Sequence, residues 1–208
     1  MKTVLCFGDS NTWGYSPVDA ERFPRDVRWP GVTRNALGDG YLVIEEGLNG
    51  RTTVWDDPLG DHWNGREYFI PCLDTHRPVD LVTIMLGTND LKKRFSLTAF
   101  DIAYGAGLLA DICLESIAGP DGGAPQVLLV SPVLIKEVGP WAEMFEGAAE
   151  KSALMAERYK AMADERGIHF FDAATVAEPS DLDGIHLEPA GHKALGEAIA
   201  QCVREILG

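Results

Sequence analysis

The chain has little positive charge and no long hydrophobic run, and these two absences argue against several classes of protein. Its 208 residues include 18 lysines and arginines against 32 aspartates and glutamates, which gives a formal net charge of -14. Nucleic acids and anionic membrane surfaces would repel such a chain, so we expect neither as a partner. The apolar run after Met1 is too short for a signal peptide and far too short to span a bilayer. We therefore expect a cytoplasmic protein with no membrane insertion.

The chain also lacks the short motifs of metal and nucleotide sites. Its four cysteines are scattered, with no pair at the short spacing of a zinc site and no pattern of a disulfide framework. Neither a Gly-x-Gly-x-x-Gly nor a Gly-x-x-x-x-Gly-Lys-Ser sequence follows the first apolar run. The pattern therefore argues against a nucleotide-binding domain, and the thiols are expected to be free.

Five continuous apolar runs alternate with helical stretches. The runs are rich in β-branched or aromatic residues, which is typical of parallel strands buried on both faces. They occupy residues 4–7, 41–44, 81–86, 127–130 and 168–171, and the clearest helical stretches are residues 99–117, 143–166 and 189–207. This alternation predicts a doubly wound α/β fold with right-handed crossovers. Because no internal repeat or long linker divides the chain, we expect one domain over residues 1–208.

Two stretches with little periodicity, residues 14–30 and 55–71, are expected to be long surface loops. Loops of that length are usually functional or involved in assembly. The tryptophans in or near these two stretches could line a narrow apolar pocket or anchor a subunit interface. They are Trp13, Trp55, Trp63 and Trp141. A third interpretation is that the loop aromatics cover the core.

A serine stands directly after the first predicted strand. Ser10 follows Gly8 and Asp9, and Gly8 permits a tight turn that would present the serine hydroxyl and backbone amide at the edge of the sheet. Open α/β sheets keep their chemistry at the carboxyl ends of their strands. Ser10 is therefore the candidate nucleophile, although a serine that merely caps a helix would have the same local sequence.

Asp183 and His186 lie three residues apart, just before the last predicted helix, so one loop could direct both side chains into the same pocket. A neutral histidine that accepts a serine proton needs its other ring nitrogen held by a carboxylate or a carbonyl. We therefore expect His186 as the base and Asp183 as its orienting partner. An ordinary surface loop would show the same short motif.

Two further segments after predicted strands could donate hydrogen bonds to a developing oxyanion. Asn89 lies in the sequence Gly-Thr-Asn-Asp after the third apolar run and offers a side-chain amide. Gly50 follows the second run, and its missing side chain would let its backbone N–H approach a ligand closely. With the backbone amide of Ser10, these groups would form a three-donor oxyanion hole. For Asn89 the alternative is an asparagine in an ordinary turn.

Together these segments resemble the four sequence blocks of the SGNH (GDSL-type) hydrolases, in the family order and spread over nearly the whole chain. The blocks correspond here to Gly8-Asp9-Ser10, Gly50, Gly87-x-Asn89-Asp90 and Asp183-x-x-His186. Residues 6–14, 45–53 and 84–90 are also similar to the bacterial arylesterase and acyltransferase subgroup. One departure from the older Gly-Asp-Ser-Leu form is Asn11 in place of leucine.

The resemblance implies a three-layer α/β/α flavodoxin-like fold with a central, mainly parallel five-stranded sheet. It implies that Ser10 is the nucleophile, His186 the base and Asp183 the carboxylate that orients the base. It also implies an oxyanion hole formed by Ser10, Gly50 and Asn89. It also implies no cofactor and no metal, and a large homo-oligomer such as an octamer. The substrate pocket is expected to include Asp9, Asn11 and Trp13.

The function expected from these residues is that of a serine esterase acting on small-molecule esters. It would hydrolyse short-chain acyl or aryl esters through an acyl-enzyme, and the resemblance implies transfer of the acyl group to alcohols or peroxide as well. The alternative is a carbohydrate or natural-product O-deacetylase that uses the same site. A metallohydrolase using Asp183, His186 and His192, and a non-catalytic binding protein, are alternatives from other classes.

Overall fold

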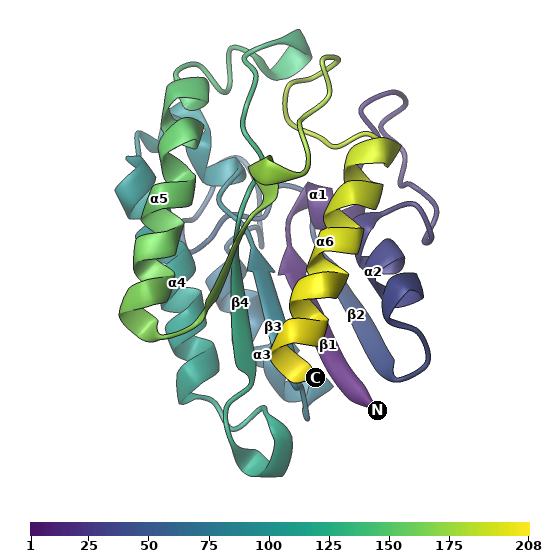
Figure 1. Cartoon of the computed structure of the whole chain (residues 1–208). Coiled ribbons are helices and arrows are strands. Elements are labelled where there is room, and N and C mark those ends of the chain that lie inside the picture. Colours follow the sequence, from purple (N-terminus) through teal and green to yellow (C-terminus); the bar gives the residue numbers. More distant parts are fainter.

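A five-stranded parallel sheet forms the centre of the molecule. The computed structural model covers residues 1–208, and its strands are β1 (Lys2–Gly8), β2 (Tyr41–Gly47), β3 (Leu81–Met85), β4 (Gln126–Ser131) and β5 (His169–Asp172). Every pairing between neighbouring strands is parallel, and the strand order is β2-β1-β3-β4-β5 (Figure 1). This is the order of the flavodoxin-like doubly wound sheet. The predicted fold class is therefore confirmed.

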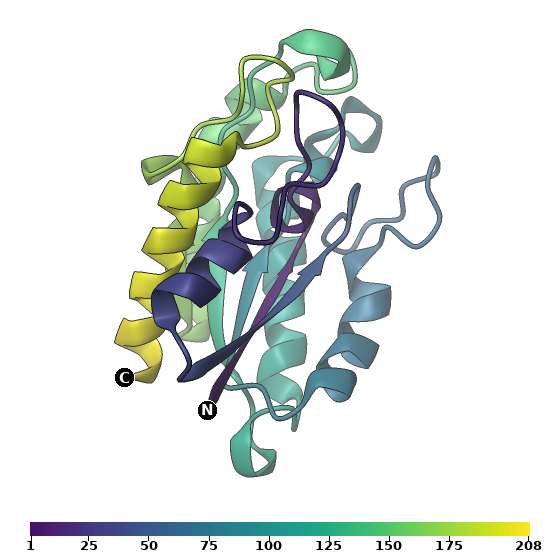
Figure 2. The same ribbon diagram turned by 90° about the vertical axis from the view of Figure 1, so that its right-hand side faces the viewer.

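Helices cover both faces of this sheet. The α-helices are α1 (Ser10–Trp13), α2 (Trp29–Leu37), α3 (Gly65–His76), α4 (Ala99–Glu115), α5 (Ala148–Arg166) and α6 (Pro189–Leu207). The short 3-10 segments are η1 (Asn89–Leu91), η2 (Lys93–Phe95), η3 (Pro120–Gly122), η4 (Gly139–Trp141) and η5 (Ala173–Thr175). Helices α2 and α6 lie on one face, and α3, α4 and α5 lie on the other (Figures 1 and 2). The result is a three-layer α/β/α arrangement.

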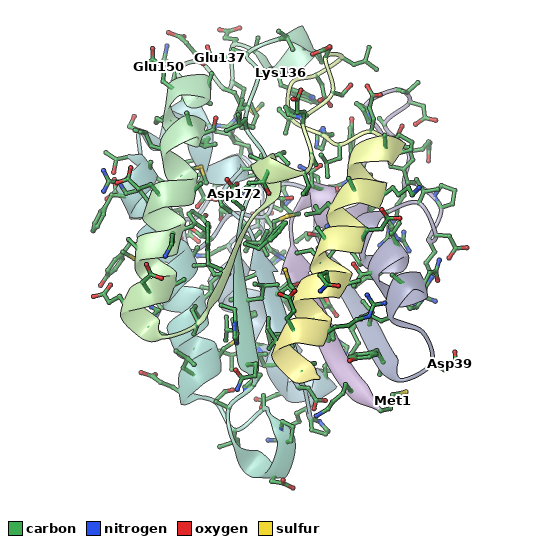
Figure 3. All side chains as sticks on the ribbon, viewed as in Figure 1. Met1, Asp39, Lys136, Glu137, Glu150 and Asp172 are labelled. Carbon is green, nitrogen blue, oxygen red and sulfur yellow. The ribbon has the colours of Figure 1, made fainter.

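Each face of the sheet has its own apolar core, because alternate residues of a strand point to opposite faces. In β1, Leu5 and Phe7 belong to the core under α3, α4 and α5, whereas Val4 and Cys6 belong to the core under α2 and α6. Side chains fill the space between the helices and the sheet (Figure 3). The central strand β3 is thus buried throughout, and β1 and β4 are buried on both faces except where they begin, as their continuous apolar runs predict.

The same prediction is wrong for the two edge strands. Strands β2 and β5 end the sheet on either side, and most of their residues are only half-buried. An edge strand has a neighbour on one side only, so its side chains receive less cover than those of a central strand. A continuous apolar run therefore does not distinguish an edge strand from a central one.

Helix α3 begins within the stretch predicted as a loop over residues 55–71, so that prediction is wrong from Gly65 onward. The Asn64 side chain caps the helix and accepts a hydrogen bond from the backbone N–H of Arg66 at 3.0 Å. Pro71 lies within the helix, where a proline normally argues against helical structure. Only four residues of the helix are buried, namely Gly65, Phe69, Cys72 and Leu73, so its apolar pattern is short.

The bounds of the other helices differ from the pattern in smaller ways. Helix α2 begins at Trp29, so the predicted loop over residues 14–30 ends slightly earlier than expected, and Pro30 occupies the first helical turn. Helix α5 begins at Ala148 rather than at residue 143, because Gly147 before it adopts a left-handed φ of 78°. Helix α6 has the predicted bounds.

Both chain termini lie at the end of the molecule where β1 begins (Figures 1 and 2). Met1 and Asp39 lie at this end, whereas Lys136 and Glu137 lie at the opposite end (Figure 3). The loops that follow the strands therefore form a face away from the termini. None of the helices combines the length and the apolar character needed to cross a membrane.

Candidate active site

The predicted site residues come together at the carboxyl end of the sheet, beside the point where the strand order reverses. The chain runs from β1 to its neighbour β2 on one side and later to β3 on the other, so the loops after β1 and β3 separate and leave a crevice. Ser10 follows β1, Gly50 follows β2 and Asn89 follows β3. Asp183 and His186 come from the loop between β5 and α6. Ser10, Gly50, Asn89 and His186 line a common cavity there.

The turn that presents Ser10 requires a glycine before it. A Cβ atom on Gly8 would lie 2.0 Å from Oγ1 of Thr12. Asp9 caps α1, and its side chain accepts a hydrogen bond from the backbone N–H of Asn11 at 3.0 Å. Ser10 is therefore the first residue of the helix and not its cap, so the helix-cap interpretation of Ser10 is wrong. Its backbone N–H lies in the first turn, where the helix itself offers no acceptor.

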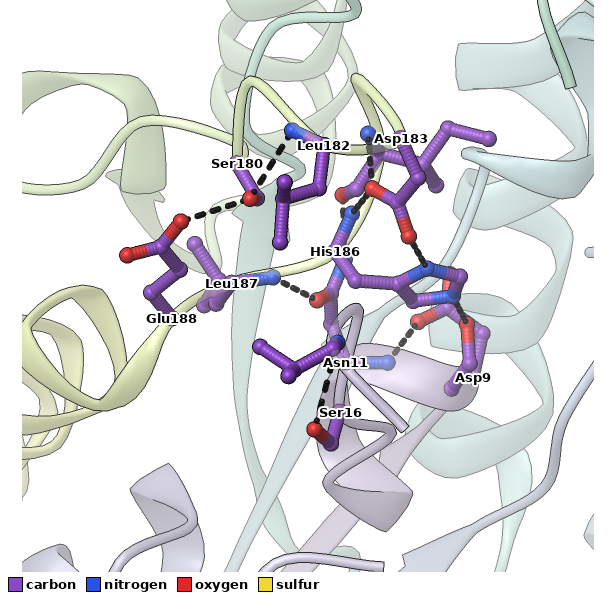
Figure 4. Close-up of polar contacts among 12 residues, drawn as sticks. Asp9, Asn11, Ser16, Ser180, Leu182, Asp183, His186, Leu187 and Glu188 are labelled. Atoms are coloured by element: carbon purple, nitrogen blue, oxygen red, sulfur yellow. Dashed lines mark hydrogen bonds and ion pairs between the residues drawn. The ribbon is translucent and has the colours of Figure 1, made fainter. Parts of the chain in front are cut away.

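Ser10, His186 and Asp183 form a continuous chain of hydrogen bonds. His186 Nε2 lies 2.9 Å from Ser10 Oγ, and His186 Nδ1 lies 2.6 Å from Asp183 Oδ2. The other oxygen, Asp183 Oδ1, accepts hydrogen bonds from the backbone N–H groups of Ile185 and His186, both at 3.0 Å. Figure 4 shows Asp183 facing the His186 ring within this loop. Because the carboxylate accepts the Nδ1–H, Nε2 is left to accept a proton from the hydroxyl.

The carboxyl group of Asp183 is held in its ionised form. Burial opposes the charge, but the hydrogen bonds from the His186 ring and from the backbone N–H groups outweigh it and keep the pKa of Asp183 below its usual value. An ionised Asp183 fixes the orientation and tautomer of His186. A carboxylate in this position would also stabilise an imidazolium, were the ring to take a proton.

Asn11 holds the His186 loop against α1. Its side-chain Nδ2 donates to the backbone carbonyl of Ile185 at 3.2 Å, and its Oδ1 accepts from the backbone N–H of Leu187 at 2.9 Å (Figure 4). These two bonds flank His186 on both sides. The ring of Tyr15 packs against the His186 ring, with 4.2 Å between centroids. The position of the histidine is therefore set by one loop and one turn of helix.

Gly50 and Asn89 lie on the opposite side of the crevice. Gly50 has a left-handed φ of 83°, and a Cβ atom there would lie 2.9 Å from the Trp63 ring, so glycine is needed at this point. One N–H of the Asn89 amide donates to the backbone carbonyl of Arg51 at 3.1 Å. The amide nitrogen carries a second hydrogen, which is available to the cavity.

Buried ionisable groups fix this side of the crevice. The guanidinium of Arg51 is almost fully buried and donates to the backbone carbonyls of Gly8, at 2.9 Å, and Glu46, which joins the ends of β1 and β2. The Asp90 carboxyl group accepts hydrogen bonds from the backbone N–H of Thr53 at 3.0 Å and from its hydroxyl at 2.5 Å. Burial raises the pKa of Asp90 to about 6, against the lowering effect of the Thr53 bonds.

A cavity of about 360 Å³ opens beside the Ser10 hydroxyl. Half of its lining is apolar, including Leu59, Trp63, Trp141, Met144, Phe145 and Ile185. Of the four tryptophans considered from the sequence, Trp63 and Trp141 line this cavity, whereas Trp13 and Trp55 do not. An apolar lining around a few polar groups is the usual composition of a small-molecule site.

Asp9, Asn11 and Trp13, which we expect in the substrate pocket, lie outside the wall of this cavity. Asp9 caps α1, and Asn11 forms hydrogen bonds with the His186 loop. The guanidinium carbon of Arg22 lies 5.0 Å from the centroid of the Trp13 ring. The three residues flank Ser10 in sequence, but the short helix turns their side chains away from the cavity.

Two cationic side chains in the cavity wall were not expected from the sequence. Lys92 Nζ and Arg94 Nη1 lie 3.1 Å and 2.8 Å from the same atom, Asp57 Oδ2. Lys92 Nζ also lies 5.0 Å from the centroid of the Trp63 ring. Lys92 and Arg94 stand just after Asn89 in the sequence, which is a signal for them. Asp57 gives no such signal, since it comes from a loop without periodicity.

The residues considered for a metallohydrolase do not form a ligand set. Asp183 and His186 bond each other and Ser10, and His192 lies apart in α6, where its Nδ1 accepts the backbone N–H of Trp29 at 3.3 Å. Burial lowers the pKa of His192 to about 3, so this histidine stays neutral. The one group of metal-binding side-chain types gathered within 4.8 Å is Glu46, Cys72 and His76. It does not belong to the cavity wall.

Comparison with known proteins identifies the family of the chain. The sequence profile of the GDSL-like lipase/acylhydrolase family matches residues 6–194. The chain belongs to this family. No curated protein matches the chain.

Solved structures similar to this GDSL-like chain include two esterases. The inhibitor-bound aryl esterase of M. smegmatis is 46% identical, with a TM-score of 0.95 and 100% of both chains covered. A carbohydrate acetylesterase from Sinorhizobium meliloti is 43% identical, again with a TM-score of 0.95 and 100% of both chains covered. A member of the lipolytic G-D-S-L family from Veillonella parvula, at 16% identity and a TM-score of 0.70, shares the fold.

Proposed function

We propose that the protein is a serine esterase in which Ser10 is the nucleophile, His186 the general base and Asp183 the carboxylate that orients it. The observation that supports this proposal is the series of hydrogen bonds from Ser10 Oγ through His186 to Asp183, at 2.9 Å and 2.6 Å, in the wall of a cavity. A serine hydroxyl is a weak nucleophile unless an adjacent base takes its proton as it attacks. His186 is placed to be that base.

In the proposed reaction, Ser10 Oγ attacks the ester carbonyl while His186 Nε2 accepts the hydroxyl proton. The resulting oxyanion would accept hydrogen bonds from the backbone N–H groups of Ser10 and Gly50 and from the Asn89 amide. His186 then donates its proton to the leaving alcohol, which departs and leaves an acyl-enzyme. Water, deprotonated by the same histidine, attacks this ester and releases the acid.

Short acyl or aryl esters are the proposed substrates. A cavity of about 360 Å³, half of whose lining is apolar, has room for a small acyl group and an aromatic or short aliphatic leaving group. The similarity to the aryl esterase of M. smegmatis supports the same substrate class.

Deacetylation of carbohydrates or natural products by the same site is the second candidate. The carbohydrate acetylesterase from Sinorhizobium meliloti is almost as similar in sequence as the aryl esterase and is equally similar in fold. Rates on phenyl acetate, on aryl esters with longer acyl chains and on acetylated sugars separate the two candidates. Fast sugar deacetylation with slow aryl ester turnover would favour the deacetylase.

Ser10→Ala tests the shared mechanism. We expect the rate on phenyl acetate to fall by several orders of magnitude, and labelling by a fluorophosphonate to disappear, because both need the hydroxyl. Ser131→Ala is the matched control, since Ser131 is buried like Ser10 and lies at the carboxyl end of the neighbouring part of the sheet, in β4, but not in the cavity wall. Full activity of Ser10→Ala would reject the mechanism.

Three further properties are part of the proposal. The apolar half of the cavity lining supports acyl transfer to alcohols or peroxide in competition with water. Phe100 and Tyr104, half-exposed and stacked on α4 with 5.9 Å between ring centroids, support association into a homo-oligomer such as an octamer. The four free cysteines are consistent with a cytoplasmic protein. Light scattering after size-exclusion chromatography measures the mass of the assembly and so tests the oligomer. We also propose that residues 1–208 fold as a single domain in each subunit.

A further inference from the structure

The cavity wall carries positive charge and no carboxylate. Lys92 and Arg94 line it, and no aspartate or glutamate does. In the whole chain, 32 acidic residues outnumber 18 lysines and arginines, so the cavity has the opposite charge balance. The remaining titratable groups in its wall are Tyr15 and His186.

Asp57 compensates for only one of the two cations. Lys92 and Arg94 both bond its Oδ2 atom, while its Oδ1 accepts the backbone N–H of Leu59 at 3.0 Å. The Asp57 side chain has no exposed surface, whereas that of Arg94 is 22% exposed. The three side chains therefore form a fixed cluster with one net positive charge, in which the carboxylate lies behind the cations.

Arg94 is the member of this cluster that is placed to bind an anion. A guanidinium has five N–H donors in a planar fork, and Arg94 directs one nitrogen to Asp57. The fork geometry matches a carboxylate, which it can bind through two parallel hydrogen bonds. Arg94, Trp141 and Met144 also line an adjoining surface groove, to which Lys93 and Glu143 contribute one charge of each sign.

We propose that the cluster Asp57, Lys92 and Arg94 selects ester substrates that carry a carboxylate group, and that Arg94 binds this group. The inference rests on the proposed esterase function and names its substrate class. A carboxylate in the cavity would meet a fixed positive charge and no like charge in the wall. A neutral ester of the same shape gains nothing from the cluster.

Matched pairs of substrates test this selection. In the first pair the leaving group differs: 4-acetoxybenzoate carries a carboxylate there, and its methyl ester carries a neutral group. The other pair is 4-nitrophenyl hemiglutarate and its methyl ester, which place the carboxylate, or its neutral counterpart, on the acyl group. The measured quantity is the ratio of kcat/KM for the charged ester to kcat/KM for the neutral ester, and we expect a ratio of about ten or more in at least one pair.

Variants of the cluster are expected to move this ratio in opposite directions. Arg94→Gln should lower it about tenfold, and Arg94→Lys should restore part of it, since the charge returns without the fork. Asp57→Asn removes the compensating charge and should raise the ratio. Lys193→Gln, which removes an exposed charge on α6, is the control and should leave the ratio unchanged. A purely structural role of the cluster would not produce opposite signs.

The outcomes separate this inference from the proposed function. Turnover of the neutral esters, abolished by Ser10→Ala, together with a ratio near one in both pairs, would overturn the inference and leave the esterase standing. Loss of the ratio in Arg94→Gln with a gain in Asp57→Asn would support it. If no ester of either kind is hydrolysed and no fluorophosphonate label is incorporated, the proposed function fails, and the inference fails with it.

Discussion

The two sides of the crevice are held by different kinds of contact. On the base side, Asp183 and His186 lie in one loop, and Asn11 fixes that loop through two backbone hydrogen bonds. On the donor side, Gly50 and Asn89 come from separate loops, which buried groups such as Arg51 and Asp90 hold together. The base side is thus organised within one loop, and the donor side depends on buried groups that join separate loops.

This difference has a consequence for robustness. Neutral hydrogen bonds to the backbone keep their strength over a wide pH range, whereas a buried carboxyl group costs free energy whenever it ionises. We therefore expect substitution of His186 to affect mainly the chemistry. Substitutions among the groups that hold the donor side should affect stability and its pH dependence as well.

His186→Ala should have the largest effect in this comparison, with a loss of about 10⁴-fold in kcat, because neither serine attack nor alcohol departure then has a proton carrier. Its melting temperature should stay near that of the wild type. His169→Ala, at an exposed position of β5, is the control. Turnover within tenfold of the wild type would show that another group is the base.

Asn89→Ala on the donor side should lower kcat by about 10²- to 10³-fold and change KM little, since an oxyanion donor acts in the transition state. Steady-state kinetics on phenyl acetate measure both quantities. Asn35→Ala, at an exposed position of α2, controls for the loss of an amide elsewhere. A rise in KM with unchanged kcat would instead assign Asn89 to substrate binding.

Asn11→Ala removes both bonds that flank His186. At about 1 kcal/mol for each net hydrogen bond, we expect a loss of about 2 kcal/mol in the free energy of unfolding. The rate should fall about tenfold, because the histidine loop becomes less well placed. Urea unfolding and kcat on the same preparation test the link, and a fully stable but inactive variant would assign Asn11 a direct chemical role.

Asp90→Asn tests the donor side through pH. Folding raises the pKa of Asp90 to about 6, so between about pH 4 and pH 6 the folded chain holds a proton that the unfolded chain has lost. The contribution of Asp90 to stability is therefore full below pH 4 and falls, by roughly 3 kcal/mol, as the pH rises through 6. The stability of the wild type relative to Asp90→Asn should fall over this interval and stay flat above pH 7. A flat difference throughout would contradict the raised pKa.

The sequence predicted the fold class and the order of the elements because buried parallel strands leave continuous apolar runs. It did not predict α3, because Pro71 lies inside that helix, or the half-buried state of β2 and β5, because edge position depends on strand order. Strand order is a property of the assembled sheet. No local pattern carries it.

The predicted site residues were found together, and their catalytic roles stay predictions. Ser10, Asn89 and the pair Asp183 and His186 stand out because each lies in a short polar segment after a strand or before a helix. The rest of the cavity wall, such as Leu59, comes from loops whose path follows from packing. Asp9, Asn11 and Trp13 adjoin Ser10 in the sequence, but the direction of their side chains follows from α1.

The placement of both chain ends beside the amino edge of the sheet has a practical consequence. A tag, a surface linker or a fused protein attached at Met1 or Gly208 would stand on the far side of the molecule from the Ser10 crevice (Figures 1 and 2). Immobilised through either end, a single chain would present its reactive face to the surrounding liquid.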